Sequence, residues 1–439
     1  MKPPVFPRER YTALPMLERG EGVYLYDKAG KRYIDASSSA CVVAIGHGRE
    51  EVAQAIFEQA KRASFTIGVH FQNEPALELA REVINLAPSG MSSVHFVSGG
   101  SEATDTAVKL ALSYQLARKA SRRTRFISRW GSYHGATIAA VSLSGHTGRR
   151  RTYHPILMDV THIPPAFCYR CPYLKSPDLC DIECARALDT EIRREGPENV
   201  CAFVAEPIVG STLGAAVPSI RYWPMIKEIC DEHDVLIIAD EVMTGFGRTG
   251  KPFGMDQFGV VPDLMVVGKG ISSGYSPLGA VIVGKKVDEV FENTSSDFPH
   301  IFTYGFNPLS AATGLAVLRI LERERLIERA ERMGRYFEKQ LSTLGALPMI
   351  GDTRGLGLLH GVEFVKDKET REPFPAGEQV ARRIFSGMAS RGVLPYIGTG
   401  TLDGTRGDHL TLCPPLIVTE EQLDEIVGSI RDTVKEFKK

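Results

Sequence analysis

Six short apolar runs, separated by helical patterns, restrict the fold of this chain more than any other feature. Continuous apolar runs of this length are typical of strands buried on both faces of a sheet. Helical patterns such as 101–120 and 219–234 lie between them, so we expect an α/β fold with a mostly parallel central sheet covered by helices. The direction of the last run stays open, because it follows its predecessor closely. The runs are VHFVS (94–98), RFISR (125–129), CAFVAEP (201–207), VLIIAD (235–240), LMVVGK (264–269) and GAVIVG (279–284).

The segments on either side of this region predict a smaller α+β domain. The N-terminal part alternates apolar and polar residues around a Lys-Ala-Gly-Lys turn, as a hairpin or meander does. We expect residues 61–315 to form the large domain, and 1–60 together with 316–439 to form the small one. The supporting patterns are a meander at 22–39, helices at 49–63, 74–87, 316–344, 376–391 and 419–437, and a strand region at 353–365.

The composition is that of an ordinary globular protein, with 439 residues, 43% hydrophobic, 24% charged and a net charge of -1. The near-neutral charge argues against binding to nucleic acid or to a membrane surface through bulk charge. No apolar run is long enough to span a membrane, and the first ten residues lack the apolar core of a secretory signal. We therefore expect a cytoplasmic protein. The arginine clusters at 122–125 and 149–151 are interpreted as solvated surface.

Polar residues stand where four of the apolar runs end. They are the Gly99–Glu102 turn, Glu206, Asp240 and Lys269, and ligands of open α/β sheets bind beyond the carboxyl ends of the strands. Each also has an ordinary explanation. The turn is a generic helix entry with a serine cap and a glutamate in the first turn. The aspartate could cap a turn or hold a metal, and a lone lysine usually extends along the surface.

Together these residues match the needs of a pyridoxal-phosphate site. That cofactor needs an amine for a Schiff base and a carboxylate that keeps its pyridine nitrogen protonated. Lys269 and Asp240 supply these groups. It also needs an anion site for its phosphate, which glycine-rich backbone at a helix N-terminus provides at Gly99, Gly100 and Ser101. Desolvation near a strand end would favour the neutral, nucleophilic form of the lysine.

The chain resembles the class III aminotransferases, of the ω-amino acid type, among the fold type I pyridoxal-phosphate enzymes. The resemblance runs nearly from end to end, and the DEVxxGFGRTG stretch followed by a lysine is its most specific part. The motifs that carry it are SGGSEATDTAVKLA (98–111), YHGAT (133–137), EP (206–207), IADEVMTGFGRTG (238–250), VGKGISSGYSPLGAV (267–281) and TYGFNPLSAA (303–312).

The resemblance implies a role for each residue around the cofactor. Lys269 would form the Schiff base and move a proton between the substrate Cα and the cofactor C4′. Asp240 would pair with the pyridine nitrogen, with Glu206 supporting it. Val242 would pack on one face of the cofactor ring and Tyr133 would stack on the other. His134 belongs to the same motif, and a structural role is expected for it.

The phosphate site and the subunit arrangement follow from the same resemblance. Gly100 and Ser101 would hold the phosphate, and the threonine that completes this site in the family comes from the neighbouring subunit. Thr303 matches that threonine, so the resemblance implies a homodimer with its active sites at the subunit interface. After Thr303 the family usually has Tyr-x-Gly-His-Pro, whereas this chain has Tyr-Gly-Phe-Asn-Pro, which alters the pocket wall.

One departure concerns the substrate carboxylate. Many ω-aminotransferases carry a switching arginine three residues before a Gly-Asp pair. This chain has Gly404 at that offset, and Arg406 directly before Gly407-Asp408. Either Arg406 binds the carboxylate from a shifted loop, or another group does. Bidentate arginine recognition is geometrically demanding, so a two-residue shift is not neutral.

A second unusual feature is the segment CYRCPYLKSPDLCDIEC (168–184), with cysteines 168, 171, 180 and 184. Four thiolates within so short a segment could bind zinc tetrahedrally. The loop between the two pairs is shorter than in common zinc ribbons, and a reducing cytosol disfavours disulfides. Zinc, free thiols and disulfides all stay open, and no metal is assigned to the catalytic site. We expect a surface insertion away from the chemistry.

These observations predict a ping-pong aminotransferase that moves an amino group from an ω-amino acid or primary amine to a keto acid such as pyruvate or 2-oxoglutarate. Racemases, aminomutases and lyases of the same family share nearly the same motifs and are the alternative. A non-catalytic, zinc-stabilised binding protein is a third possibility, against which the intact Lys269 and Asp240 argue.

Overall fold

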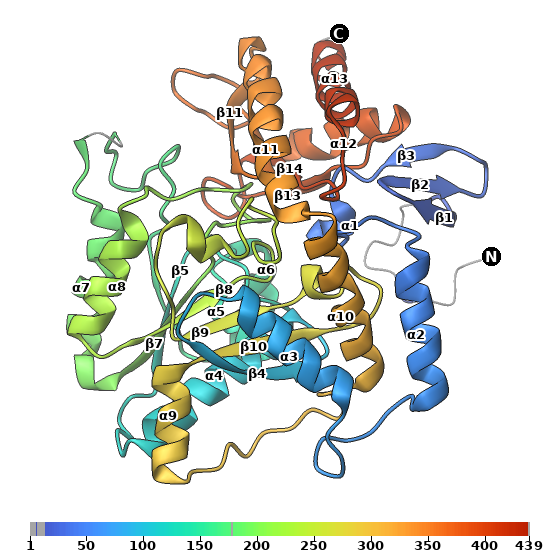
Figure 1. Ribbon diagram of the computed structural model, residues 1–439. Coiled ribbons are helices and arrows are strands. Elements are labelled where there is room, and N and C mark those ends of the chain that lie inside the picture. The colour runs from blue at the N-terminus through green and yellow to red at the C-terminus, as the bar shows by residue number, and fades with distance from the viewer. Residues whose placement is uncertain (1–5, 7–13, 177–178, 438–439) are drawn as a thin grey trace.

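The centre of the molecule is a seven-stranded sheet in the order β4-β10-β9-β8-β7-β5-β6 (Figure 1). The structure is a computed structural model that describes residues 6, 14–176 and 179–437. The N-terminal stretch in which no secretory signal is expected lies, apart from residue 6, outside the described residues. The strands are β4 (Met91–Val97), β5 (Arg125–Arg129), β6 (Thr161–Ile163), β7 (Val200–Ala205), β8 (Leu236–Asp240), β9 (Leu264–Val267) and β10 (Gly279–Gly284).

All six predicted strands are confirmed. Strands β6, β5, β7, β8 and β9 run parallel, whereas β10 pairs antiparallel with both β4 and β9. The direction that the sequence left open for 279–284 is therefore antiparallel. The prediction omitted β6, since a strand of three residues leaves too short an apolar run to recognise.

Both faces of the sheet are buried, and the side chains alternate between two cores. In β9, Met265 and Val267 belong to the core under α3 and α10, whereas Leu264 and Val266 face the core under α4. This double burial explains the continuous apolar runs. The helices around the sheet are α3 (Glu74–Leu86), α4 (Gly100–Ala117), α5 (Ile138–Leu143), α6 (Thr147–Arg150), α7 (Glu183–Glu195), α8 (Tyr222–Glu232), α9 (Lys285–Thr294) and α10 (Pro308–Arg323).

The smaller unit is built on a four-stranded antiparallel sheet in the order β11-β12-β14-β13. In Figure 1 it lies above the central sheet, with the N-terminal strands beside it. Its elements are β11 (Ile350–Leu356), β12 (Leu359–Phe364), β13 (Tyr396–Thr399), β14 (Asp408–Leu412), α11 (Leu326–Ser342), α12 (Val380–Ser390) and α13 (Glu420–Glu436). The N-terminal elements are β1 (Leu17–Glu21), β2 (Tyr24–Asp27), β3 (Arg32–Ile34), α1 (Ser38–Cys41) and α2 (Glu50–Arg62).

The N-terminal and C-terminal segments are joined by main-chain hydrogen bonds. The Ile34 N–H donates to Gly392 O at 2.8 Å, and the Leu394 N–H donates to Ile34 O at 2.9 Å. We therefore propose that 1–60 and 316–439 form one domain, as the sequence suggested, and that 61–315 form the other. Helix α10 crosses the boundary between residues 315 and 316.

One helix prediction was wrong in its extent. The stretch 316–344 is not a single helix, because α10 ends at Arg323 and α11 begins at Leu326, with Arg325 in the left-handed region (φ 50°) between them. Helix α10 also begins earlier than predicted. Asn307 caps it by accepting hydrogen bonds from the Leu309 and Ser310 N–H groups. None of the helices in the described residues is long and apolar enough to cross a membrane.

Candidate active site

Three parallel strands deliver three of the predicted site residues to one edge of the central sheet. Glu206 follows β7, Asp240 ends β8, and Lys269 lies two residues beyond β9. Because β7, β8 and β9 are neighbours and run parallel, their carboxyl ends meet at the same edge. Lys269 is half-buried and has a φ of 44°, so the chain turns sharply where the lysine side chain leaves the strand.

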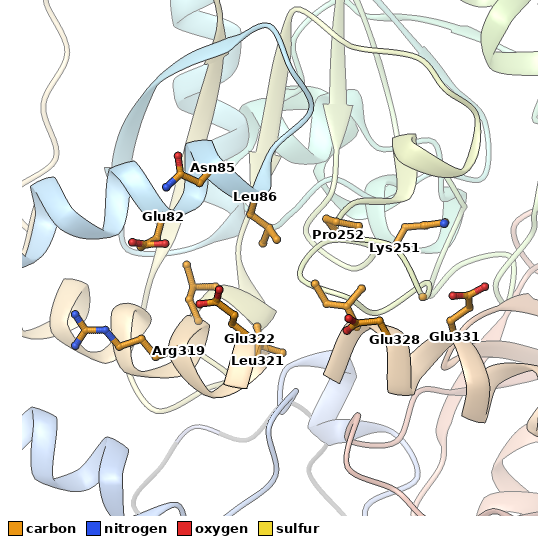
Figure 2. Close-up of a pocket in the computed structure, with 13 residues that line it drawn as sticks. Glu82, Asn85, Leu86, Lys251, Pro252, Arg319, Leu321, Glu322, Glu328 and Glu331 are labelled. Atoms are coloured by element: carbon orange, nitrogen blue, oxygen red, sulfur yellow. The ribbon is translucent and has the colours of Figure 1, made fainter. Parts of the chain in front are cut away.

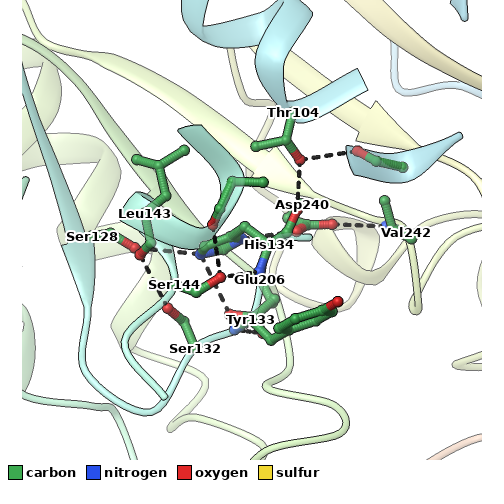
Figure 3. A network of polar contacts seen from close by, with 12 residues as sticks. Thr104, Ser128, Ser132, Tyr133, His134, Leu143, Ser144, Glu206, Asp240 and Val242 are labelled. Atoms are coloured by element: carbon green, nitrogen blue, oxygen red, sulfur yellow. Dashed lines mark hydrogen bonds and ion pairs between the residues drawn. The ribbon is translucent and has the colours of Figure 1, made fainter. Parts of the chain in front are cut away.

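Asp240 is held at both of its carboxylate oxygens (Figure 3). Oδ2 lies 2.7 Å from His134 Nδ1, and Oδ1 accepts a hydrogen bond from the Val242 N–H at 3.0 Å. Burial lowers the pKa of His134, but the nearby carboxylates of Glu206 and Asp240 outweigh it, and the pKa is raised overall. His134 therefore orients the Asp240 carboxylate, which defines the structural role that the sequence left unspecified.

Glu206 belongs to the same buried network. Its Oε1 accepts the Tyr133 N–H at 3.1 Å, and its Oε2 lies 3.7 Å from Arg129 Nη2. Burial raises the pKa of Glu206, although His134 and Arg129 act in the opposite direction. Sequence reasoning missed Arg129. It is a fully buried charge at the end of an apolar strand, the same signal that drew attention to Lys269.

The Gly99–Glu102 turn starts α4 without a side-chain cap. Gly99 is the N-cap residue, and the Glu102 carboxylate folds back to accept the Ser98 N–H at 2.8 Å, so the ordinary explanation of a serine-capped helix entry does not apply. No acceptor among the described residues takes the N–H groups of Gly100 and Ser101. A Cβ at Gly100 would lie 3.0 Å from the methyl groups of Val242. This tight, donor-rich backbone fits a phosphate group.

Tyr133 and Val242 are both half-buried beside this edge. The Tyr133 ring extends from the Asp240–Glu206 network in Figure 3. The guanidinium carbon of Arg149 lies 4.3 Å from the centre of that ring. The interpretation of 149–151 as solvated surface is therefore wrong for Arg149 and Arg150, which are half-buried. It holds for the exposed Arg151.

Two predicted site residues lie in exposed positions. Thr303 is exposed on the segment before α10. The Arg406 side chain is 47% exposed, and its guanidinium is paired with Asp403 at 2.8 Å and Glu372 at 3.8 Å. Arg406 is therefore already ion-paired with two neighbouring carboxylates.

The cysteine segment is partly buried. Cysteines 168, 171 and 184 are free thiols, and all four cysteines of the segment line a cavity of about 20 Å³. Within the described residues, no three potential ligands are arranged to hold a metal ion. The segment also contacts strand β12, because Arg170 Nε donates to the buried Glu363 Oε1 at 2.5 Å. The prediction that this segment is a surface insertion is therefore only partly correct.

A cavity of about 580 Å³ lies apart from the strand ends (Figure 2). It is formed by α3, α10, the start of α11 and the loop around Lys251, with Glu82, Glu322 and Glu331 among its lining residues. None of the predicted site residues lines it. The chemistry is therefore assigned to the sheet edge.

The central α/β sheet and the amine and carboxylate at its edge define the class of the protein, a transaminase of fold type I. The family model for class-III aminotransferases matches residues 5–434. The chain belongs to the class III aminotransferase family, and it is an enzyme of that family.

Relatives and solved structures agree over nearly the whole chain. An uncharacterized aminotransferase of Schizosaccharomyces pombe is 38% identical, covering 96% of this chain and 92% of its own. The putrescine–pyruvate aminotransferase of Pseudomonas aeruginosa is 37% identical, over 95% and 89%. The structure of an (S)-enantioselective omega-transaminase from Thermomicrobium roseum superimposes with a TM-score of 0.92, at 34% identity over 99% and 96%.

Proposed function

We propose that this aminotransferase uses pyridoxal 5′-phosphate, bound at the sheet edge formed by β7, β8 and β9. The main support for this proposal is the Asp240 carboxylate. Hydrogen-bonding partners hold both of its oxygens, and it lies at the same sheet edge as Lys269. Family membership supports the cofactor, since class III aminotransferases are pyridoxal-phosphate enzymes. The donor groups around the site fit it too: an amine, a buried carboxylate, and free N–H groups on a glycine backbone.

The side chains of this site have separate roles in the proposal. When bound, pyridoxal phosphate supplies the electron-withdrawing ring that makes removal of the substrate Cα proton feasible. The Lys269 amine would hold the cofactor covalently, and it would carry the proton between the substrate Cα and C4′. Asp240 holds a proton on the pyridine nitrogen, and Glu206 supports this network.

The surrounding residues bind and orient the cofactor in this proposal. Tyr133 would stack on one face of the ring and Val242 would pack on the other, so that water is excluded from both faces. The main chain of Gly100 and Ser101 binds the phosphate. The Ser101 Oγ already accepts the Ala136 N–H at 3.0 Å, which fixes the turn.

Thr303 completes the phosphate site of a second subunit in this proposal, so the protein is a homodimer with its sites at the interface. The face around Thr303 supports this, because it exposes apolar side chains that a monomer would leave in water. Val69 is 71% exposed, Phe71 70% and Ile301 53%. Together with neighbours such as Phe306 they line a groove of about 390 Å³.

The proposed reaction transfers an amino group from an ω-amino acid or primary amine to a keto acid, pyruvate or 2-oxoglutarate. The Pseudomonas relative, named for putrescine and pyruvate, supports this substrate class. We also propose a cytoplasmic location. The buried Cys41, Cys201, Cys230 and Cys413 are free thiols, which suits a reducing compartment.

A half-reaction experiment tests the proposal. Purified protein given pyridoxal phosphate should show the visible absorption band of the bound cofactor, and Lys269→Ala should abolish it. A primary amine alone should bleach the band after a single turnover, and pyruvate should restore it. Absence of the band, even with added cofactor, would refute the proposal. Continued turnover without a keto acid would point instead to a racemase, aminomutase or lyase.

A further inference from the structure

Arg149 is a half-buried cation beside the proposed cofactor site. Its guanidinium carbon lies 4.3 Å from the centre of the Tyr133 ring, and its Nη2 lies 3.4 Å from the Tyr396 hydroxyl on β13. Among the described residues, no Asp or Glu oxygen lies within ion-pair distance of it. A half-buried cation without a protein counter-charge is therefore available to bind a ligand anion.

The guanidinium has donors available for an anion. Its carbon lies over the Tyr133 ring, a contact that uses none of its five N–H donors. Only one of these donors has a protein partner, the distant Tyr396 hydroxyl. A planar fork of free N–H groups is suited to a carboxylate, which it binds through two parallel hydrogen bonds.

The neighbouring arginines are already engaged. Arg150 donates to Ser144 O at 3.2 Å and contacts the imidazole of His162 at 3.1 Å. Arg406 is paired with Asp403 and Glu372. Of these three arginines, Arg149 alone both contacts a proposed cofactor ligand and lacks a strong partner.

The loop at Gly404 explains why the cation comes from α6. Gly404 has a φ of +81°, and a Cβ there would lie 2.5 Å from the Cβ and Oγ1 atoms of Thr147 on α6. This backbone excludes an arginine at position 404, where many ω-aminotransferases carry theirs. The loop packs directly against the helix that carries Arg149.

We propose that Arg149 binds the carboxylate of the keto-acid acceptor, and that it does so in place of an arginine at position 404. The inference rests on the proposed function, and it assigns a specificity-determining residue and a substrate class to that site. Tyr396 supports the guanidinium from the small domain, so the carboxylate subsite lies between the two domains.

Calorimetric titration of the resting holoenzyme with pyruvate and with neutral pyruvamide tests the subsite without turnover. The unchanged protein should bind pyruvate more tightly than pyruvamide. Arg149→Met should weaken pyruvate binding about 10- to 100-fold, as expected for losing hydrogen bonds to a charged group. Pyruvamide binding should change less than about threefold. Arg149→Lys, which keeps the charge but loses the fork, should retain part of the preference.

The matched control is Arg151→Met, which removes an exposed arginine two positions away and should leave both affinities unchanged. In half-reactions, Arg149→Met should slow the pyruvate step at least tenfold more than the amine step, a selectivity that a general structural defect would not produce. An undiminished preference for pyruvate in Arg149→Met would overturn the inference, as would a selective loss in Arg406→Met. Failure of the proposed function would look different, because the unchanged protein would then not accept an amino group at all.

Discussion

His134 Nδ1 lies 2.7 Å from Asp240 Oδ2, and the two residues are only 3% and 5% exposed. The other imidazole nitrogen, Nε2, lies 3.3 Å from Ser128 Oγ and 3.9 Å from Glu206 Oε2. The imidazole therefore bridges two carboxylates that end neighbouring strands. With the Val242 N–H on its second oxygen, the Asp240 carboxylate is held in one orientation, ready for a protonated ring nitrogen.

Replacing His134 should weaken cofactor binding without removing any atom that would touch the cofactor. His134→Phe keeps the packing volume but leaves Asp240 Oδ2 without its charge-assisted partner. We expect the dissociation constant for pyridoxal phosphate to rise about 10- to 100-fold. Titration of the apoprotein measures this. Ser128→Ala, which removes only the longer contact on the far nitrogen, is the control and should change the constant less than about threefold.

The same residue should give stability a defined pH dependence. Because the folded pKa of His134 is raised, the folded state binds a proton more tightly than the unfolded chain. The stabilisation is fully present below the unfolded pKa of about 6.5 and is lost as the pH rises through the folded value. The difference in unfolding free energy between the wild type and His134→Phe should therefore be larger near pH 6 than near pH 9. Urea unfolding at both pH values measures it, and an unchanged difference would contradict the expectation.

The strands of the large domain were predictable because burial on both faces leaves a clear signal. A run such as LMVVGK can hardly be anything but a buried strand, and β9 occupies it. The direction of β10 and the break at Arg325 were not predictable. Both depend on contacts between segments far apart in the chain, and a left-handed arginine leaves no compositional trace.

The site residues, too, were predictable only in part. Lys269 and Asp240 stand out because a charged side chain at the end of an apolar strand is unusual. The sequence assigned Arg149 to the surface, since a run of three arginines ordinarily is solvated. Only the fold shows that one of them lies over Tyr133 while the next lies against His162. The sequence around α6 contains no pattern that reveals how close this helix lies to the strand ends.

Cys184 should behave as a buried free thiol. Burial, followed by the neighbouring Cys168, raises the pKa of the Cys184 thiol to about 12. Its alkylation rate should therefore keep rising with pH beyond the point at which an ordinary thiol, with a pKa near 8.5, levels off. Mass spectrometry of iodoacetamide-treated protein follows this. Protein purified without a histidine tag should carry less than roughly 0.2 zinc per chain, and a stoichiometric amount would revive the zinc hypothesis.

Glu363 should be one of the most sensitive positions for stability. Its fully buried carboxylate pairs with Arg170 at 2.5 Å and Arg354 at 2.8 Å, and it also accepts the Thr401 hydroxyl at 2.9 Å. Burial alone would raise its pKa, but the two guanidinium groups outweigh it and the pKa is lowered. The carboxylate thus stays charged, and it joins the cysteine segment to the small-domain sheet.

Glu363→Gln leaves the nearly buried Arg170 guanidinium without its counter-charge and Arg354 with Asp352 alone, so we expect a loss of about 3–5 kcal/mol of unfolding free energy. Because the folded pKa of Glu363 is lowered, this contribution is present above the unfolded pKa and is lost as the pH falls. Denaturation at neutral and acidic pH should therefore show the gap to the wild type narrowing in acid. Glu232→Gln is the matched control. It breaks a pair with Arg193 in which both side chains are more than half exposed, and such pairs contribute about 0–1 kcal/mol. Equal effects of the two substitutions would mean that the buried ion pairs of Glu363 contribute no more to stability than an exposed pair.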